Sequence, residues 1–401
     1  MSTITPSYSL MQGAEWAVDS CLYCYSSVFL LSCGLNNTLI GVLLGIAAGL
    51  SFWGQIFFGE LLNRRGRRAL RRFLLLGAGV LLADNLILLA GIPRGGAVPL
   101  FLINCLLLQL FPAFLNSAAM CEIQFGVPVN FGVGRGTGSL GYALCSVIVG
   151  RLLLRFGTSA MFCAGAVLSA ALLAGILWFF TSADAYRAQR PGSPPPPSSP
   201  EGKAPVRRGF DVLFLRTYRR YTLLLGGCVL LMMGHTYMSN FIYQIVAFKG
   251  GNEGATGVAS AIAACAEVPV LFLFGRVIGK LRCDQWLKLS CVLLTAKMLL
   301  AYFSGNLFLL QSTELLQLGY ALFVVSSVYY TGAVIPHRDA ISGQAYLNAA
   351  STLGVLLSLL TGGILLDCFG VPALLLTGAG ALAAGTVILF CSAEPAPPQT
   401  C

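Results

Sequence analysis

Twelve continuous apolar runs, separated by short polar stretches, organise the chain. Each is close to the roughly 20 residues that an α-helix needs to cross a bilayer. None alternates apolar and polar positions as the strands of a membrane β-barrel do. The runs lie near 17–35, 39–62, 73–92, 98–120, 138–156, 160–181, 221–246, 257–279, 286–303, 308–330, 344–366 and 373–392. We therefore predict an all-α, polytopic membrane protein with twelve transmembrane helices.

The composition agrees with this fold class. Hydrophobic residues make up 57% of the 401 positions and charged residues 10%. A soluble domain has about 45–50% apolar and about 25% charged residues. A soluble enzyme and a disordered chain are thereby excluded.

A proline-rich stretch, PGSPPPPSSP (191–200), interrupts the pattern after the sixth run. Proline at this density cannot continue a helix and keeps a segment extended and solvated. We predict an N-terminal six-helix bundle over 1–181, a basic cytoplasmic linker over 182–220 and a C-terminal six-helix bundle over 221–401.

Basic residues are concentrated in alternate loops. Six arginines lie between positions 64 and 72, eight basic residues lie between 187 and 220, and more follow the eighth and tenth runs. The positive-inside rule places such loops in the cytoplasm, and all of them fall on one side if twelve spans separate two cytoplasmic termini. The net charge of +10 then reflects orientation in the plasma (inner) membrane rather than nucleic-acid binding.

The two halves share a sequence repeat. GSLGYALCSVIVGRLLLRFG (138–157) and STLGVLLSLLTGGILLDCFG (351–370) match at 8 of 20 positions without a gap. Glycine within a span allows helices to approach closely in lipid. Two pseudo-symmetric bundles joined by a linker are typical of a transporter with its substrate site between the halves, near mid-bilayer.

Ionisable side chains inside the apolar runs are candidate functional residues, because an ion in hydrocarbon is costly unless it is paired or faces water. Glu267 and Lys297 lie on neighbouring runs and are expected to form a pair, with either a structural or a substrate- or proton-linked role. Asp19 and Asp84 are further candidates for ion coupling. Asp84 is followed by Asn85, so a hydrogen-bonded structural role is the alternative.

The segment GHTYMSN (234–240) carries the histidine that lies inside a predicted span. His235 titrates near neutrality when unperturbed, although a hydrogen-bonded structural histidine is the alternative. Tyr237 and Asn240 continue a polar, aromatic lining that suits a hydroxyl-rich ligand. We include all three among the candidate substrate-binding residues.

No cofactor or metal site is predicted. The chain has 14 cysteines without zinc-ligand spacing and two histidines. It contains no Gly-rich nucleotide-binding loop, so drive by an ion gradient is expected rather than by ATP. Paired His or Asp-rich motifs of a membrane enzyme are also missing from the sequence, and we expect no enzymatic activity.

The loop GELLNRRGRR (59–68) resembles the cytoplasmic signature of the major facilitator superfamily, with Asn63 where an acidic residue usually stands. GRVIGKLR (275–282) resembles the same signature more weakly, at the equivalent place in the second half. FGVGRGTGSLGYALCSVIVG (131–150) and AEVPVLFLFGRVIGKL (266–281) are similar to the lactose-permease-like branch of oligosaccharide/proton symporters. This resemblance implies alternating access between two bundles.

When the permease's sugar-binding residues are matched by position, the resemblance implies that Glu122 and Arg135 bind the substrate. The alternative for Arg135 is a residue that only fixes the membrane topology. Tyr142 replaces the tryptophan that stacks on the sugar, and Glu267 and Lys297 match an acid and an arginine. The permease's proton-site histidine and glutamate correspond to Gln317 and Tyr320, and its seventh-span acids to Met238 and Phe241. Lactose itself is therefore not implied.

The leading hypothesis is a secondary active transporter of a small polar solute, a sugar or related metabolite, coupled to protons. Efflux of a drug or metabolite by the same fold is one alternative, and a non-transporting sensor or scaffold on a transporter fold is another. The expected partners are the solute, protons and the lipid bilayer, with no nucleic acid and with the chain acting as a monomer.

Overall fold

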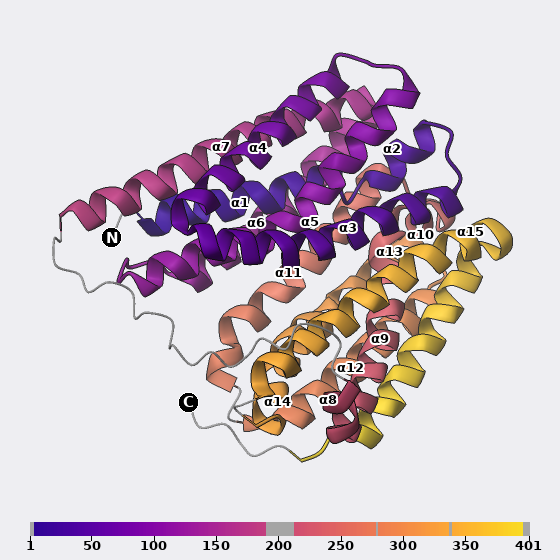
Figure 1. The fold of residues 1–401 in the computed structure, drawn as a ribbon. Helices are drawn as coiled ribbons and strands as arrows, with labels where there is room; N and C mark the ends of the chain where they lie inside the picture. The colour runs from indigo at the N-terminus through magenta and orange to yellow at the C-terminus, as the bar shows by residue number, and fades with distance from the viewer. Residues whose placement is uncertain (1–3, 190–211, 278–279, 337–338, 396–401) are drawn as a thin grey trace. The chain divides into compact units, whose positions relative to one another are not determined.

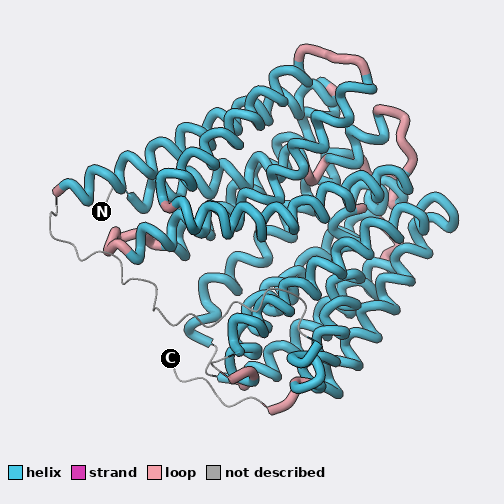
Figure 2. Tube along the Cα trace, viewed as in Figure 1, coloured by secondary structure: helices cyan, strands magenta, loops and turns pink. Residues whose placement is uncertain are grey.

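The computed structural model describes residues 4–189, 212–277, 280–336 and 339–395, and all the regular elements in these ranges are helices (Figures 1 and 2). Three parts of the sequence patterns lie outside the described residues: the proline-rich stretch, His337 with Arg338, and part of the 275–282 segment. The fold is all-α, as the sequence predicts.

The chain divides into two compact units. Unit 1 comprises residues 1–26 and 46–210, and unit 2 comprises residues 27–45 and 211–401. The predicted boundary assigned residues 27–45 to the N-terminal bundle, whereas here they group with the second half. The reason is close packing: a Cβ added at Gly41 would lie 2.1 Å from the carbonyl oxygen of Leu359.

Unit 1 contains six helices or parts of helices, with α3 beginning in unit 2. They are α1 (Ile4–Leu22), α3 (Asn37–Arg65), α4 (Arg67–Leu89), α5 (Arg94–Gln124), α6 (Phe131–Phe156) and α7 (Thr158–Ala188). Helix α1 packs against α6 and α7, and α4 packs against α5 and α7.

Unit 2 is built around the packing of α15 against α9 and α12. Its elements are α2 (Ser26–Ser32), α8 (Val212–Thr217), α9 (Arg219–Asn240), α10 (Ile242–Phe248), α11 (Glu253–Val277), α12 (Cys283–Phe303), α13 (Leu307–Thr313), the 3₁₀ helix η2 (Glu314–Gln317), α14 (Leu318–Val334) and α15 (Ala340–Ser392). Helix α15 bends at Gly370, whose φ of 77° is left-handed and suits glycine.

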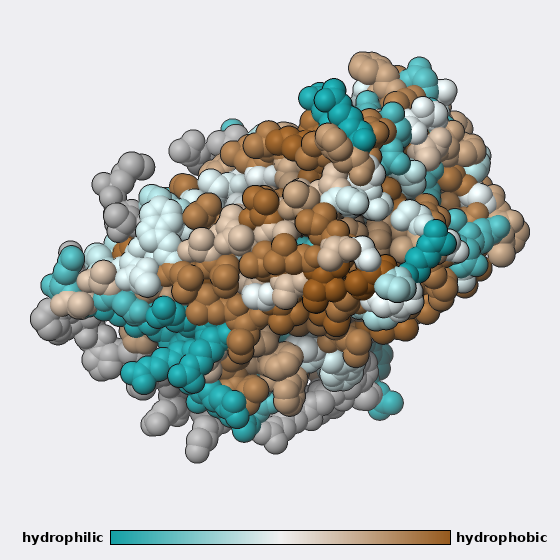
Figure 3. All heavy atoms as spheres, turned by 90° about the horizontal axis from the view of Figure 1, so that it is seen from above, coloured by the Kyte–Doolittle hydropathy of each residue, from teal (hydrophilic) through white to brown (hydrophobic). Residues whose placement is uncertain are grey.

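Within the described ranges, nine helical stretches are long and apolar enough to cross a membrane. Large apolar side chains such as Trp53, Phe57 and Leu76 are exposed, and hydrophobic surface covers much of the face shown in Figure 3. The protein is therefore a multi-pass membrane protein. The count of twelve stays a prediction, because several predicted spans are broken: α9 from α10 at Phe241, and α13 from α14 by η2.

The repeated glycines mark equivalent contacts in the two units. A Cβ at Gly141 of α6 would lie 2.6 Å from the carbonyl oxygen of Gly13 on α1. A Cβ at Gly354 of α15, 213 positions further on, would lie 2.5 Å from the carbonyl oxygen of Val229 on α9. Each contact brings two backbones together without an intervening side chain, which is how small residues favour helix association in lipid.

This packing predicts a stability difference between two otherwise similar substitutions. Gly141→Val should lower the free energy of unfolding by about 1–3 kcal/mol, because an overpacked contact must open. A Cβ at Gly79 of α4 would meet nothing within 4 Å, so Gly79→Val is the matched control. Thermal unfolding in detergent should show a lower midpoint for Gly141→Val alone; equal midpoints would contradict the close contact.

Candidate functional site

Polar side chains gather inside each unit, and we describe the two groups separately. The unit-1 cluster lies on α1, α5 and α6 and comprises Gln12, Glu15, Trp16, Asp19, Asn116, Arg135 and Tyr142. The unit-2 network lies on α11, α12 and η2 and comprises Glu267, Lys297, Glu314 and Gln317. No group of three His, Cys, Asp or Glu side chains in the described ranges is placed to hold a metal ion.

Helix α1 contributes the acidic face of the unit-1 cluster. Gln12, Glu15 and Asp19 are spaced by three and four residues, so they lie on one side of the helix. The Gln12 side-chain amide donates to Asn116 Oδ1 of α5 at 3.1 Å, which ties this face to the bundle interior.

Glu15 is fully buried, and neither of its carboxylate oxygens has a hydrogen-bond partner among the described residues. The charges of Asp19 and Arg135 both act on it. Buried polar groups are nearly always partnered. Glu15 is therefore positioned to receive a proton or a hydrogen-bond donor beyond those that the described residues provide.

Aromatic rings connect α1 to α6 beside this carboxylate. The Arg135 guanidinium lies over the Trp16 ring, 4.5 Å from its centroid, and the Trp16 and Tyr142 rings meet edge to face at 6.3 Å. Asn130 caps α6 by accepting from the Val133 N–H, so Arg135 lies inside this helix rather than before it. The two predicted residues Arg135 and Tyr142 are thus joined through Trp16.

The unit-2 network surrounds a buried ammonium group. Lys297 is 3% exposed, and its Nζ donates to Glu314 Oε2 and to Gln317 Oε1, each at 2.6 Å. Gln317 Nε2 donates in turn to Glu267 Oε1 at 2.9 Å. The predicted pair of Lys297 with Glu267 is therefore corrected: Glu314 forms the ion pair, and Gln317 links that pair to Glu267.

The backbone of this network is unusual for a membrane span. Glu314 and Gln317 lie in η2, a 3₁₀ segment between α13 and α14. A 3₁₀ segment inside a helix often marks a hinge, and broken spans are typical of the ion and substrate sites of transporters. The other oxygen of Glu314, Oε1, is buried and has no hydrogen-bond partner in the described part of the chain.

The α9 candidates lie in the same unit. His235 is buried and stacks on Tyr320, with ring centroids 4.4 Å apart. Tyr237 is fully buried, and its hydroxyl lies 2.6 Å from Thr361 Oγ1 of α15. Asn240 ends α9, and its Nδ2 is buried without a hydrogen-bond partner among the described atoms. Their role in substrate binding stays a prediction.

Two further candidates lie apart from these groups. Glu122 is fully buried and forms ion pairs with Arg67 of α4 and Arg187 of α7. No contact in the described structure joins it to Arg135. Asp84 is buried on α4 beside Asn85, whose side chain donates to the Leu81 carbonyl. Both have structural surroundings, and their functional roles remain predictions.

Sequence reasoning missed Glu15, Trp16 and Glu314. Glu314 is the one charged residue in the predicted run 308–330, so the rule used for Glu267 and Lys297 identifies it. Glu15 and Trp16 precede the predicted start of the first span at 17, whereas α1 begins at Ile4.

The sequence matches the model of one protein family, the MFS_1 like family, over residues 15–375. No curated protein matches. Among solved structures, a point mutant of the nucleoside transporter NupG is similar with a TM-score of 0.76 at 14% identity, covering 98% of this chain and 100% of that one.

Two further folds are similar over nearly the whole chain. A bacterial homologue of the human lysosomal transporter Spinster has a TM-score of 0.63 at 13% identity, with 97% of this chain and 95% of that one covered. A point mutant of the peptide transporter POT, in complex with alafosfalin, has a TM-score of 0.67 at 13% identity, with 96% and 92% covered. At these identities the likeness concerns the fold.

The ion pair predicts non-additive effects on stability. Lys297→Met leaves Glu314 buried without its counter-charge and should cost about 3–5 kcal/mol, while adding Glu314→Gln should restore much of this loss. Thermal unfolding of both single variants and the double variant measures the coupling. Glu60→Gln, at a surface residue paired with Arg64, should be nearly neutral. Independent, additive losses would contradict the pair.

Proposed function

The chain belongs to the MFS_1 like family, and from this premise we propose that it is a proton-coupled secondary transporter of a small polar solute. The family and the similar folds are transporters rather than enzymes. The proposed solute is a sugar or a related polyhydroxylated metabolite, and the proposed mechanism is alternating access. We further propose a plasma-membrane location, cytoplasmic termini and a monomeric state.

The buried unit-2 network is the observation that carries this proposal. It holds one ammonium, Lys297, and two carboxylates, Glu314 and Glu267, connected by Gln317. The Lys297–Glu314 ion pair is buried, and the half-buried Glu267 joins it through Gln317. A proton on Glu314 would remove the counter-charge of Lys297 in apolar surroundings, where such a change is costly. The network is therefore suited to proton coupling.

The groups around the network are suited to a proton site of variable occupancy. Glu314 Oε1 has no hydrogen-bond partner among the described residues, so a proton on it displaces no existing contact. Lys297 can keep its second acceptor, Gln317 Oε1, when Glu314 is neutral. Protonation of Glu314 would then remove the ion pair that links Lys297 to η2. A 3₁₀ segment can accommodate the resulting change in backbone conformation.

The unit-1 cluster supplies the chemistry for the solute. Arg135 offers five donors in a planar fork, which suits vicinal hydroxyls. The Trp16 ring, one face of which lies under this guanidinium, and the half-buried Tyr142 ring offer apolar surface for a sugar ring or a base. Glu15 offers two unused acceptors. A nucleoside, the class of solute for which the NupG transporter is named, combines these same features and belongs in the panel of test solutes.

The coupling role of the network predicts a specific transport defect. In proteoliposomes, Glu314→Gln should abolish accumulation driven by an inward proton gradient but retain solute counterflow, because exchange needs no net proton movement. Sugars and nucleosides form the panel, and Glu60→Gln is the matched control. Gradient-driven accumulation by Glu314→Gln would contradict coupling at this residue; absence of any transport by the wild type would contradict the proposed function.

If Arg135 binds the solute, uptake should depend on the planar shape of its guanidinium group and not only on its charge. Arg135→Lys keeps the charge but loses the fork, so uptake should fall about 10- to 100-fold, corresponding to one or two charged hydrogen bonds. Arg151→Lys, at an exposed position of the same helix, should transport normally. If Arg135→Lys transports like the wild type while Arg135→Gln fails to insert, Arg135 is a topological anchor.

A further inference from the structure

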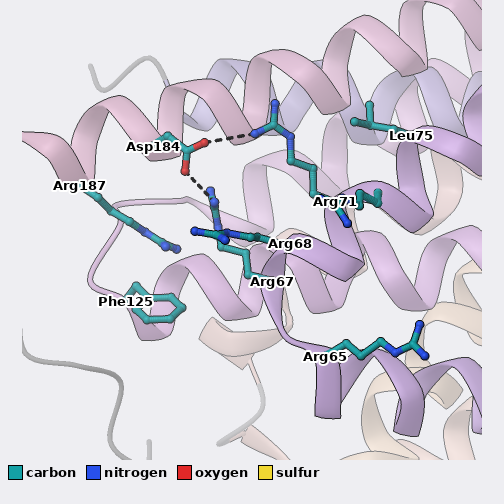
Figure 4. A pocket seen from close by; sticks show the side chains of 9 residues that line it. Arg65, Arg67, Arg68, Arg71, Leu75, Phe125, Asp184 and Arg187 are labelled. Atoms are coloured by element: carbon teal, nitrogen blue, oxygen red, sulfur yellow. Dashed lines mark hydrogen bonds and ion pairs between the residues drawn. The ribbon is translucent and has the colours of Figure 1, made fainter.

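A cavity of about 710 Å³ lies where α3 meets α4 in unit 1, separate from the groups assigned to transport. We call it the arginine cavity. Its lining consists of Arg65, Arg67, Arg68, Arg71, Arg72, Leu75, Phe125, Asp184 and Arg187. Figure 4 shows side chains from α4 and α7 converging on this space, with Asp184 joined to Arg67 and Arg71.

One wall of the arginine cavity is held in place. Arg67 bonds to Glu122 at 2.5 Å and to Asp184 at 2.6 Å, and Arg187 pairs with the other oxygen of Glu122. The Arg67 guanidinium also lies over the Phe180 ring, and that of Arg187 over the Phe125 ring. These guanidinium groups are therefore pre-positioned rather than free to spread into water.

The remaining arginines give the cavity a large excess of positive charge. Six guanidinium groups line it, and subtracting the carboxylates of Asp184 and Glu122 leaves four positive charges. Arg65, Arg68 and Arg72 are exposed, and no ion pair with a described carboxylate involves them. Like charges held this closely repel one another, so the arrangement favours an anion between them.

The backbone adds to this field. Helix α4 begins at Arg67, and its N-cap, Gly66, has no side chain to cap the first N–H groups. The N-terminus of a helix carries a partial positive charge and exposed donors that favour phosphate. Guanidinium forks match the oxygen geometry of phosphate better than they match a spherical anion.

We propose that the arginine cavity binds a polyphosphorylated anion, with a phosphorylated lipid headgroup as the favoured source. A phosphate monoester carries about −1.5 to −2 charges, so two of them offset about three to four of the excess positive charges. The apolar stretch Asn37–Leu62 ends near the cavity, and Arg67–Leu89 begins at it. Leu75 lines the cavity, and Leu76 is 72% exposed on the same helix. Acyl chains would thus have apolar surface next to the headgroup.

The test measures binding to the full-length protein in detergent. The probes are a short-chain bis-phosphorylated phosphatidylinositol, short-chain phosphatidylserine and phosphatidylcholine, and soluble inositol trisphosphate. The bis-phosphorylated lipid should bind most tightly, and raising the salt concentration should weaken it. Arg68→Gln with Arg72→Gln should weaken binding about 30-fold, because each arginine near an anionic lipid contributes about a factor of five.

A matched pair of substitutions controls for net charge. Arg151 and Arg155 are also exposed and four residues apart, on α6, so Arg151→Gln with Arg155→Gln should leave binding unchanged. If the Arg68 and Arg72 double variant does not fold, Arg72→Gln alone should weaken binding about fivefold.

The probes also separate the two sources of phosphate. Equal affinity for soluble inositol trisphosphate and the lipid would assign a free polyphosphate ligand to the same site, whereas preference for the lipid would assign a headgroup. The proposal is overturned if neither phosphorylated probe binds the wild type, or if the cavity variants and the α6 control lose binding equally. Transport activity is not the readout, so failure here is distinct from failure of the proposed function.

Discussion

An ammonium group buried among apolar membrane helices must find its counter-charge within the protein, and at Lys297 the counter-charge is Glu314. Removal of either charge alone leaves the other uncompensated, which costs far more than the pair contributes. This constraint brings three neighbouring segments of the chain together at one point: α12 provides the ammonium, η2 the carboxylate, and α11 a second carboxylate through Gln317. The same constraint makes the network sensitive to a proton, because one added proton changes a charge balance that apolar surroundings do not screen.

The surrounding apolar helices associate without polar side chains between them. In lipid, burial of apolar side chains between helices provides little driving force, so close backbone contact has to replace it. Gly141 against Gly13 in unit 1, and Gly354 against Val229 in unit 2, provide such contacts at repeat-related positions. Rigid contacts of this kind on α6 and α15 hold each bundle together, while the breaks at Phe241 and at η2 provide places for local change.

The fold could be predicted from sequence because its signal is distributed over many residues. Long apolar runs predict membrane helices whatever their neighbours are, and the run at 138–156 differs from α6 mainly at its start. Features that depend on a single residue were harder to predict from the sequence. The η2 segment has the same apolar pattern as the helices beside it, so hydrophobicity does not reveal it. The partner of Lys297 depends on tertiary proximity: the sequence prediction pairs it with Glu267, which matches the permease resemblance, and misses Glu314. Glu15 was missed because helix α1 extends well before its most apolar part.

The proposed coupling moves solute and proton together through this protein. It is tested most directly by adding a solute outside wild-type proteoliposomes at equal pH on both sides and recording internal pH with a trapped dye. Proton-coupled import predicts that entry of the transported solute acidifies the interior, and that a proton ionophore abolishes this signal while solute entry continues. Entry of labelled solute without any change in internal pH would contradict the account, and would leave the Lys297–Glu314 pair as a structural element of the bundle.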